Sequence, residues 1–225
     1  MIVATNINKT FNNKNNESNQ VLQNISLEIE TGKITSLMGA SGVGKSTLLY
    51  ILGTLEKPDS GEIFLNLKNN SFNCSNLSEK ELSIIRNKHI GFVFQFHHLL
   101  PEFTTLENIM MPSLILGLSS KEAEKKAFPL MEIMGIEKNK GQKPNELSGG
   151  EQQRAAIARA LINSPEIIFA DEPTGNLDST NTNNVINLIK QINVELEVTF
   201  LIATHSKEIA KESHKIINMQ DGKII

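Results

Sequence analysis

A nine-residue segment, GASGVGKST (39–47), constrains the fold of this 225-residue chain more than any other feature. It matches the pattern G-x-x-x-x-G-K-S/T, with Lys45 and Ser46 at the end. The apolar run ITSLM (34–38) predicts a strand before it, and KSTLLYILGTL (45–55) predicts a helix after it. In a strand–loop–helix unit, successive backbone N–H groups at the helix N-terminus face an anion. The segment therefore predicts a phosphate-binding loop in an α/β fold.

The chemistry of the loop depends on its residue types. Its glycines allow the backbone to pass close to phosphate groups and to adopt positive φ. The Lys45 ammonium would neutralise the β- and γ-phosphates, and the Ser46 hydroxyl would reach Mg²⁺. The candidate nucleotide-binding residues are Gly39, Ala40, Ser41, Gly42, Val43, Gly44, Lys45, Ser46 and Thr47.

The rest of the chain supports an α/β fold. The runs EIIFA (166–170) and VTFLIAT (198–204) lack polar alternation, as strands covered on both faces do. Helical patterns cover 119–136, 151–163 and 181–196. Strands interleaved with helices are typical of α/β proteins. By contrast, the stretch from about 96 to 160 carries no convincing strand, which indicates a helical insertion.

The N-terminal part has a different pattern. VATNINKTF and VLQNISLEIE alternate as half-buried strands do, and they flank the Asn-rich stretch NNKNNESNQ (12–20), which predicts a hairpin with an exposed loop. The polar stretch 67–82 predicts a second surface excursion, in which Cys74 is an incidental loop residue. Ser78 and Glu81 form a capping-box pattern that opens the helix ELSIIRNKH.

Two carboxylates follow the strand of IIFADEPTGNLD (167–178). Asp171 and Glu172 stand at its C-terminal end, where open α/β sheets bind ligands. Asp171 is placed to hold Mg²⁺ through water, and Glu172 could polarise an attacking water. An acidic pair before a proline is by itself most often a strand-ending turn. The phosphate-binding loop in the same chain favours the catalytic interpretation.

A second candidate anion site lies in LSGGEQQR (147–154). Ser148 is a good helix cap, and Gly149 and Gly150 precede a long helical pattern. For Ser-Gly-Gly alone, a simple cap and turn would be the better interpretation. The full octapeptide is far more specific.

Composition excludes several classes of protein. Lys and Arg total 22 and Asp and Glu total 25, a net charge of −3, so a strongly basic nucleic-acid binder is not expected. The single cysteine excludes an intramolecular disulfide and a multi-cysteine zinc site. No apolar run approaches the roughly 18–20 residues of a membrane span, and the N-terminal segment lacks the layout of a signal peptide. These features predict a cytosolic globular protein without a nucleic-acid partner.

Taken together, the motifs resemble those of ABC transporter nucleotide-binding subunits over nearly the whole chain. GASGVGKS resembles the Walker A motif, IIFADE the Walker B motif with its catalytic glutamate, and LSGGEQQR the family signature. The resemblance places Gln95 at the Q-loop and Asp178 at the D-loop. It makes His205 the switch histidine and Phe11 the candidate adenine-stacking residue, although a buried strand-end Phe11 is an equal alternative.

The resemblance also implies a fold and a mechanism. It implies a P-loop NTPase (RecA-like) α/β core with a parallel sheet, an N-terminal antiparallel β subdomain and an inserted α-helical subdomain. A single domain would span 1–225, with the core in about 1–95 and 160–225 and the helical subdomain in about 96–160. ATP and Mg²⁺ would be the cofactors, and the metal would be held by Ser46, Gln95 and Asp171.

Hydrolysis would follow from the same residues. Glu172 would be the general base, His205 would hold the γ-phosphate, and Gln95 would complete the catalytic set. In a head-to-tail homodimer, Ser148, Gly149 and Gly150 of one protomer would cap the ATP on the phosphate loop of the other. Asp178 would lie beside that nucleotide.

The segment FHHLLPEFTTLENIMMP (96–112) indicates a branch of the family. It resembles ATPases that serve lipoprotein release, macrolide-type export and cell division, and it is most similar to the lipoprotein-releasing branch. This implies that residues 95–111, a predicted loop with Phe96, Leu99, Leu100 and Phe103 exposed, face an integral membrane subunit. The chain would then lie peripherally on the cytoplasmic face of the inner membrane.

Alternative functions remain at this point. Macrolide-type export and cell division are sibling branches, and a soluble switch acting on ribosomes, DNA ends or Fe–S assembly is a different class. A ribosomal factor usually carries two cassettes, and a DNA-repair type needs a long coiled coil between the phosphate loop and the signature. A GTPase is disfavoured because no N-K-x-D motif is present.

Tyr50 is interpreted as packing on the helix after the phosphate loop.

Overall fold

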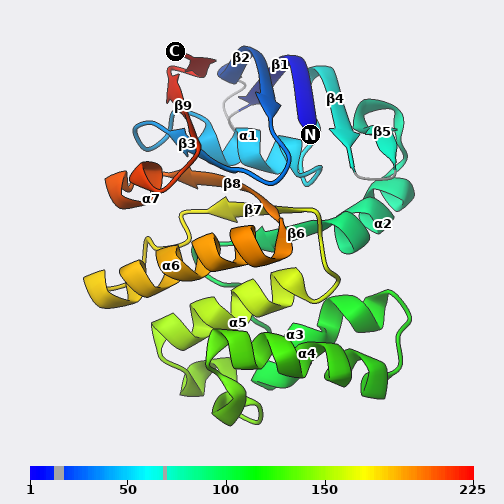
Figure 1. Cartoon of the computed structure of the whole chain (residues 1–225). Helices are drawn as coiled ribbons and strands as arrows, with labels where there is room; N and C mark the ends of the chain where they lie inside the picture. The colour runs from blue at the N-terminus through cyan, green and yellow to red at the C-terminus, as the bar shows by residue number, and fades with distance from the viewer. Residues whose placement is uncertain (13–17, 68–69) are drawn as a thin grey trace.

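The computed structural model describes residues 1–12, 18–67 and 70–225. Most of the predicted hairpin loop at 12–20 lies outside the described residues. The described strands form two sheets, one antiparallel and one largely parallel, with a helix between them and further helices below the parallel sheet (Figure 1). No helix in these ranges is both long enough and apolar enough to span a bilayer.

The antiparallel sheet, with strand order β2-β1-β4-β5, comes from the N-terminal part of the chain. Its strands are β1 (Ile2–Asn12), β2 (Ser18–Ile29), β4 (Ser60–Asn66) and β5 (Ser71–Asn73). The predicted pair of alternating strands is therefore confirmed as β1 and β2. Cys74, expected in an exposed loop, is instead buried in the core beneath this sheet, because the short 3₁₀ turn Cys74–Asn76 directs it inward.

The second sheet has the strand order β10-β9-β3-β8-β7-β6, and β3, β6, β7, β8 and β9 run parallel. Its strands are β3 (Ile34–Met38), β6 (Ile90–Val93), β7 (Ile167–Asp171), β8 (Thr199–Thr204), β9 (Lys215–Gln220) and β10 (Lys223–Ile224). Along β7, Ile168 packs into the core formed with the helices, whereas Phe169 packs into the core shared with the antiparallel sheet. Coverage of both faces explains why its sequence is apolar throughout.

The helices lie on both sides of the parallel sheet (Figure 1). They are α1 (Lys45–Leu52), α2 (Glu79–His89), α3 (Thr105–Ile115), α4 (Ser120–Met134), α5 (Gly149–Leu161), α6 (Ser179–Leu196) and α7 (Lys207–Lys211). Helix α1 lies between the two sheets, and α5 and α6 cover the opposite face of the parallel sheet (Figure 1). Ser78 caps α2 through a capping box with Glu81, as predicted.

Helices α3, α4 and α5 pack together below α6 (Figure 1). The stretch 96–160, all of which the structure describes, contains no strand, as the sequence predicted. Part of the predicted loop is wrong, however, because residues 105–111 belong to α3, which begins at a capping box between Thr104 and Glu107. Leu99 is also not exposed as expected, since it packs against the core. The exact boundaries of the core and the helical part stay a prediction.

Candidate nucleotide site

The phosphate loop is closely packed against the antiparallel sheet. Gly44 is the N-cap of α1 and has a φ of +101°, and a Cβ atom there would lie 2.9 Å from the carbonyl oxygen of Val21. Both features require glycine. Lys45 is buried, and its Nζ donates hydrogen bonds of 2.9 Å to the carbonyl oxygens of Gly39 and Ala40. The ammonium is thereby held over the loop, where the sequence predicted a phosphate.

Asp171, at the C-terminal end of β7, connects the sheet to the phosphate loop. Its carboxylate is buried and accepts a hydrogen bond of 2.9 Å from Ser46 Oγ at Oδ1. The Tyr50 hydroxyl donates to Oδ2 at 2.7 Å. Burial, together with this bond to a carboxylate, raises the pKa of Tyr50 well above its ordinary value, so the phenol stays a proton donor.

The sequence interpretation missed the contact of Tyr50 with Asp171. Helical spacing was an available signal, because Tyr50 lies four residues beyond Ser46 on α1 and thus on the same helix face. No motif includes this position, so the pattern alone gave it no role beyond packing.

Glu172 is held in an unusual backbone conformation beside His205. Its φ is +43°, and its N–H donates to the carbonyl oxygen of Ala203 at 2.8 Å. The carboxylate accepts a hydrogen bond from Thr204 Oγ1 at 3.1 Å, and its Oε1 lies 2.8 Å from His205 Nδ1. A non-glycine residue with positive φ stores strain of the kind that clusters at functional sites. Two of the three predicted catalytic residues, Glu172 and His205, are thus in direct contact.

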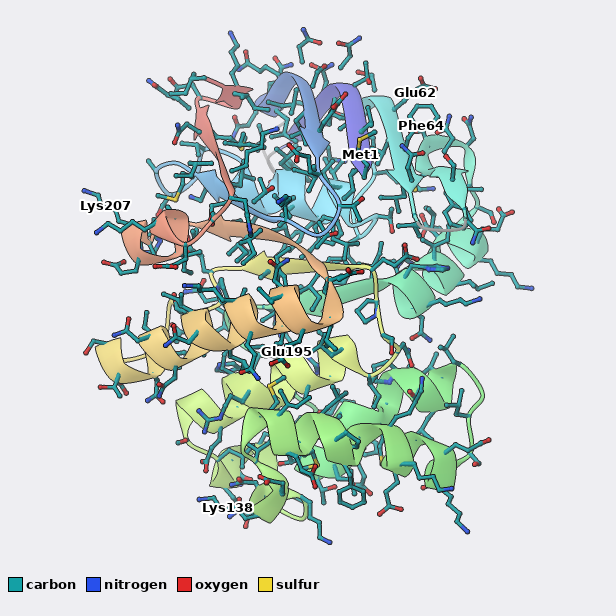
Figure 2. All side chains as sticks on the ribbon, viewed as in Figure 1. Met1, Glu62, Phe64, Lys138, Glu195 and Lys207 are labelled. Atoms are coloured by element: carbon teal, nitrogen blue, oxygen red, sulfur yellow. The ribbon has the colours of Figure 1, made fainter. Side chains whose placement is uncertain are left out.

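Gln95 follows β6 and lies against the segment after Glu172. Its carbonyl oxygen accepts a hydrogen bond of 2.9 Å from Asn176 Nδ2. A Cβ atom on Gly175 would lie 3.0 Å from Gln95 Nε2. Glu172, Gly175 and His205 share a shallow hollow of about 390 Å³, with Lys207 also in its lining. Lys207 projects outward at the edge of the molecule (Figure 2).

The segment 148–150 forms a different surface. Ser148 caps α5 through a capping box, in which its Oγ accepts from the Glu151 N–H at 3.3 Å and donates to Glu151 Oε2 at 2.8 Å. The Ser148 N–H also donates to Glu151 Oε2 at 2.9 Å, and the two bonds that this carboxylate accepts lower the pKa of Glu151, the N–H of Ser148 being the largest contributor. Ser148 and Gly149 are exposed, whereas Gly150 is buried. A Cβ atom on Gly150 would lie 2.6 Å from Asn181 Oδ1.

Asn181 belongs to the start of α6, which Asp178 caps. The Asp178 carboxylate accepts bonds from the Asn181 N–H at 2.9 Å and from Asn181 Nδ2 at 2.7 Å. Hydrogen bonding by the Asn181 backbone N–H is the main cause that lowers the pKa of Asp178. Gly150 and Asp178 are therefore linked through one asparagine, although the sequence predicted no contact between them.

Phe11 lies near the end of β1 and is 41% exposed, so the alternative of a buried residue is wrong. Lys9 Nζ lies 5.2 Å from the centre of its ring. An exposed aromatic face is available for stacking. Its role toward a nucleotide stays a prediction.

The structure brings most of the predicted residues to one side of the molecule, in two groups. Phosphate-loop residues, Asp171, Glu172 and His205 surround the carboxyl ends of β3, β7 and β8. The start of α5 lies on the same side but in a lower layer, with β7 and α6 between it and α1 (Figure 1). Among the described residues, the segment 148–150 makes no hydrogen bond to the phosphate loop.

Comparison with known proteins places this arrangement in a family. The family model described as ABC transporter matches residues 22–175, which is more than half of the chain. This chain belongs to the ABC transporter family. Membership confirms the prediction of a P-loop NTPase fold with ATP binding and ATP hydrolysis.

Two curated relatives of this ABC cassette are lipoprotein-releasing system ATP-binding proteins named LolD. The one from Bacteroides fragilis is 50% identical over 225 residues and covers 100% of both chains. The one from Aquifex aeolicus is 48% identical over 206 residues, covering 92% of this chain and 90% of the relative.

Two solved structures of the bacterial ABC transporter cassette MJ0796 are also similar. The dimeric structure has 41% identity and a TM-score of 0.90, and covers 100% of this chain and 96% of that chain. A dimeric post-hydrolysis state bound to ADP and Pi has 40% identity and a TM-score of 0.89, with the same coverage.

Proposed function

We propose that this chain is the ATP-hydrolysing subunit of a lipoprotein-releasing transporter, bound peripherally to membrane subunits on the cytoplasmic face of the inner membrane. The observation that carries the proposal is its 50% identity, over the full length of both chains, to a protein named for that system. The contact between Glu172 and His205 supports the catalytic part, because a carboxylate oriented by a neighbouring group can act as a general base.

The oxygen atoms around Asp171 fit a magnesium ion. Mg²⁺ prefers hard oxygen ligands. Ser46 Oγ and Asp171 Oδ1 lie 2.9 Å apart in a partly buried position beside the phosphate loop. We assign Ser46, Asp171 and Gln95 to the metal, which would supply positive charge to offset the charge that develops on the phosphates. Lys45 would add to that charge, and Glu172 would take a proton from the attacking water.

A head-to-tail homodimer would complete the site. Ser148 and Gly149 are exposed at the start of α5, and helix N-termini favour anions. Because they lie in a different layer from the phosphate loop of their own chain, a second protomer is needed to bring such a segment to ATP. The dimeric form of the similar cassette supports this arrangement.

The membrane subunit would dock beside residues 95–111. A mainly apolar groove of about 440 Å³ lies between α2, β6, α3 and α5, with Phe94, His98 and Ile115 in its lining. Ile115 in this lining is 70% exposed, and so is Phe96, which lies between Phe94 and His98 in the sequence. Large exposed apolar side chains in one area are typical of interaction sites. A short amphipathic helix from a cytoplasmic loop of the membrane subunit fits this groove.

Reconstitution tests the function. The chain is co-expressed with the membrane subunits of a lipoprotein-releasing system from the same source and placed in vesicles that contain a labelled lipoprotein. We expect ATP-dependent transfer of the label to a soluble acceptor, and no transfer with the Glu172→Gln variant. A complex that hydrolyses ATP but leaves the label in the vesicles would contradict the lipoprotein assignment.

Crosslinking tests the docking surface. Glu102→Cys should form a crosslink to a cytoplasmic loop of the membrane subunit, whereas Lys138→Cys, at the far end of the helical part (Figure 2), should not. Burial raises the pKa of the Cys74 thiol to about 11, so the natural cysteine should not compete. Equal crosslinking from both positions would place the interface elsewhere.

A further inference from the structure

We propose that Tyr50 is a positioning residue that fixes the orientation of the Asp171 carboxylate for Mg²⁺. The inference rests on the proposed role of Asp171 in holding the metal. It assigns to Tyr50 a function that the phosphate-loop pattern, which ends before this position, does not include.

Each carboxylate oxygen of Asp171 accepts a hydrogen bond from a different residue of α1. Ser46 Oγ donates to Oδ1 at 2.9 Å, and Tyr50 OH donates to Oδ2 at 2.7 Å. A carboxylate that is held at one oxygen alone can still rotate about its last side-chain bond. The second bond removes that freedom, so that Oδ1 stays beside Ser46. Asp171 is only 8% exposed, which makes replacement of the phenol by water difficult.

The aromatic ring of Tyr50 is itself held in place. Its centre lies 6.2 Å from that of Phe94, with the planes tilted by 57°. Phe94 stacks on Phe92 and meets the His98 ring edge-on, at centre distances of 5.8 Å and 5.0 Å. Phe94 and His98 also line the groove between α2, β6, α3 and α5. Tyr50 thus lies between this groove and the metal-binding carboxylate.

The composition of the chain provides a direct probe. Tyr50 is its only tyrosine, and the chain has no tryptophan. Intrinsic fluorescence therefore reports on Tyr50 alone. A carboxylate that accepts a hydrogen bond from a phenol quenches its emission, because it takes the proton on excitation. Emission from Tyr50 should then respond to any change in the orientation or charge balance of Asp171.

The first arm of the test uses Tyr50→Phe, which keeps the ring and removes the hydroxyl. We expect the Mg²⁺ concentration for half-maximal ATP hydrolysis to rise on the order of 10-fold, as for loss of a hydrogen bond to a charged group. Nucleotide affinity measured in EDTA should stay within about 2-fold of the unmodified protein, because the metal is absent. Ser113→Ala is the matched control. It removes the buried hydroxyl of Ser113 on α3, which donates a hydrogen bond to Asn163.

The second arm needs no variant at Tyr50. Mg²⁺ is titrated into the unmodified chain at a constant nucleotide concentration, which keeps the nucleotide absorbance constant. We expect the tyrosine emission to change with the same midpoint as Mg²⁺ binding. In the Asp171→Asn variant, the emission should start higher and stay unchanged through the titration.

The inference is overturned if Tyr50→Phe leaves the Mg²⁺ concentration for half-maximal hydrolysis unchanged. It is also overturned if the tyrosine emission changes neither with Mg²⁺ nor in the Asp171→Asn variant. Either result in a protein that still hydrolyses ATP leaves the proposed function intact. Failure of the unmodified chain to bind or hydrolyse ATP would instead count against the proposed function.

Discussion

The two candidate anion-binding regions of this chain, the phosphate loop and the segment 148–150, differ in how they are completed. Around the phosphate loop, two buried charged side chains are each held by hydrogen bonds. Lys45 donates to a carbonyl oxygen of the loop, and Asp171 at the end of β7 accepts from Ser46 on α1. At the start of α5, Ser148 and Gly149 are exposed, and the serine is bonded within its own capping box. The first region is assembled within the chain. The second faces outward, as expected for a surface that acts on a neighbour.

Because of this difference, substitutions in the two regions should affect two separate steps, ATP binding and dimer formation. Substitutions near the phosphate loop should weaken ATP binding by the isolated protomer. Substitutions at 148–150 should leave that protomer able to bind ATP and should affect association instead. Since ligand binding shifts an equilibrium only through differential affinity, ATP favours the closed dimer if the outward segment contacts it there.

The largest expected effect is on turnover. Glu172→Gln removes the negative charge beside His205 and keeps the shape, so hydrolysis should fall by about 10²- to 10⁴-fold, as for loss of a general base. Binding of MgATP, measured by calorimetry, should be retained. A variant with normal turnover would exclude Glu172 as the base and would move the chemistry away from the first region.

A somewhat smaller effect should follow loss of the buried ammonium. Lys45→Ala removes the charge aimed at the phosphates, and MgATP affinity should fall on the order of 10²-fold. Equilibrium dialysis with labelled ATP measures the change. Lys207→Ala is the control, because Lys207 lies at the rim of the neighbouring hollow. Equal losses in the two variants would point to general electrostatic attraction without a specific phosphate loop.

Substitution of two adjacent glycines should affect the stability of the protein to different extents. A Cβ atom on Gly150 would lie 2.6 Å from Asn181 Oδ1, whereas one on Gly149 meets its nearest atom, Leu177 Cδ2, at 3.8 Å. Gly150→Ala should lower the free energy of unfolding by about 1–3 kcal/mol through overpacking. Gly149→Ala should change it by about 0.5 kcal/mol or less. Urea denaturation compares them, and equal values would show that the contact with α6 carries no strain.

The smallest effect should depend on pH. The folded-state pKa of Glu151 is lowered from an ordinary value of 4.5. A lowered pKa stabilises the fold above the unfolded-state value, and this contribution disappears as the pH falls through the folded-state value. Glu151→Gln should therefore cost about 0.5 kcal/mol at pH 7, screened by solvent, and progressively less as the pH falls below 4.5. Thermal melts over this pH range measure it, and a constant difference would contradict an electrostatic origin.

Local patterns allowed much of the fold to be predicted. Apolar runs located β3, β7 and β8, since their residues are covered on both faces, and the capping box at Ser78 located α2. Helix α3 was missed because residues 95–111 were interpreted as a loop, although Thr104 and Glu107 form a capping box. Cys74 was misplaced because burial depends on the sheet above it, which no local pattern encodes.

In the candidate site too, local motifs were predicted from the sequence, whereas contacts between distant segments were not. The phosphate loop and the acidic pair follow from contiguous motifs. The contact between Tyr50 and Asp171, and that between Gly150 and Asn181, join segments that are distant in sequence. Such pairs depend on how β7 and α6 pack against α1 and α5. Residue type and spacing therefore predict which groups are candidates for catalysis and binding, but not which neighbours hold those groups in place.

The segment 148–150 is proposed to act on the ATP of a second protomer. The most direct measurement is the mass of the Glu172→Gln protein in solution with MgATP, by light scattering after size exclusion. We expect a dimer, and a monomer that still binds MgATP when Ser148→Arg is added. Ser119→Arg is the matched control, because Ser119 caps α4 with the same capping box and should leave the dimer intact. Loss of MgATP binding by the Ser148→Arg monomer would show that the segment acts within its own chain, and would contradict the account.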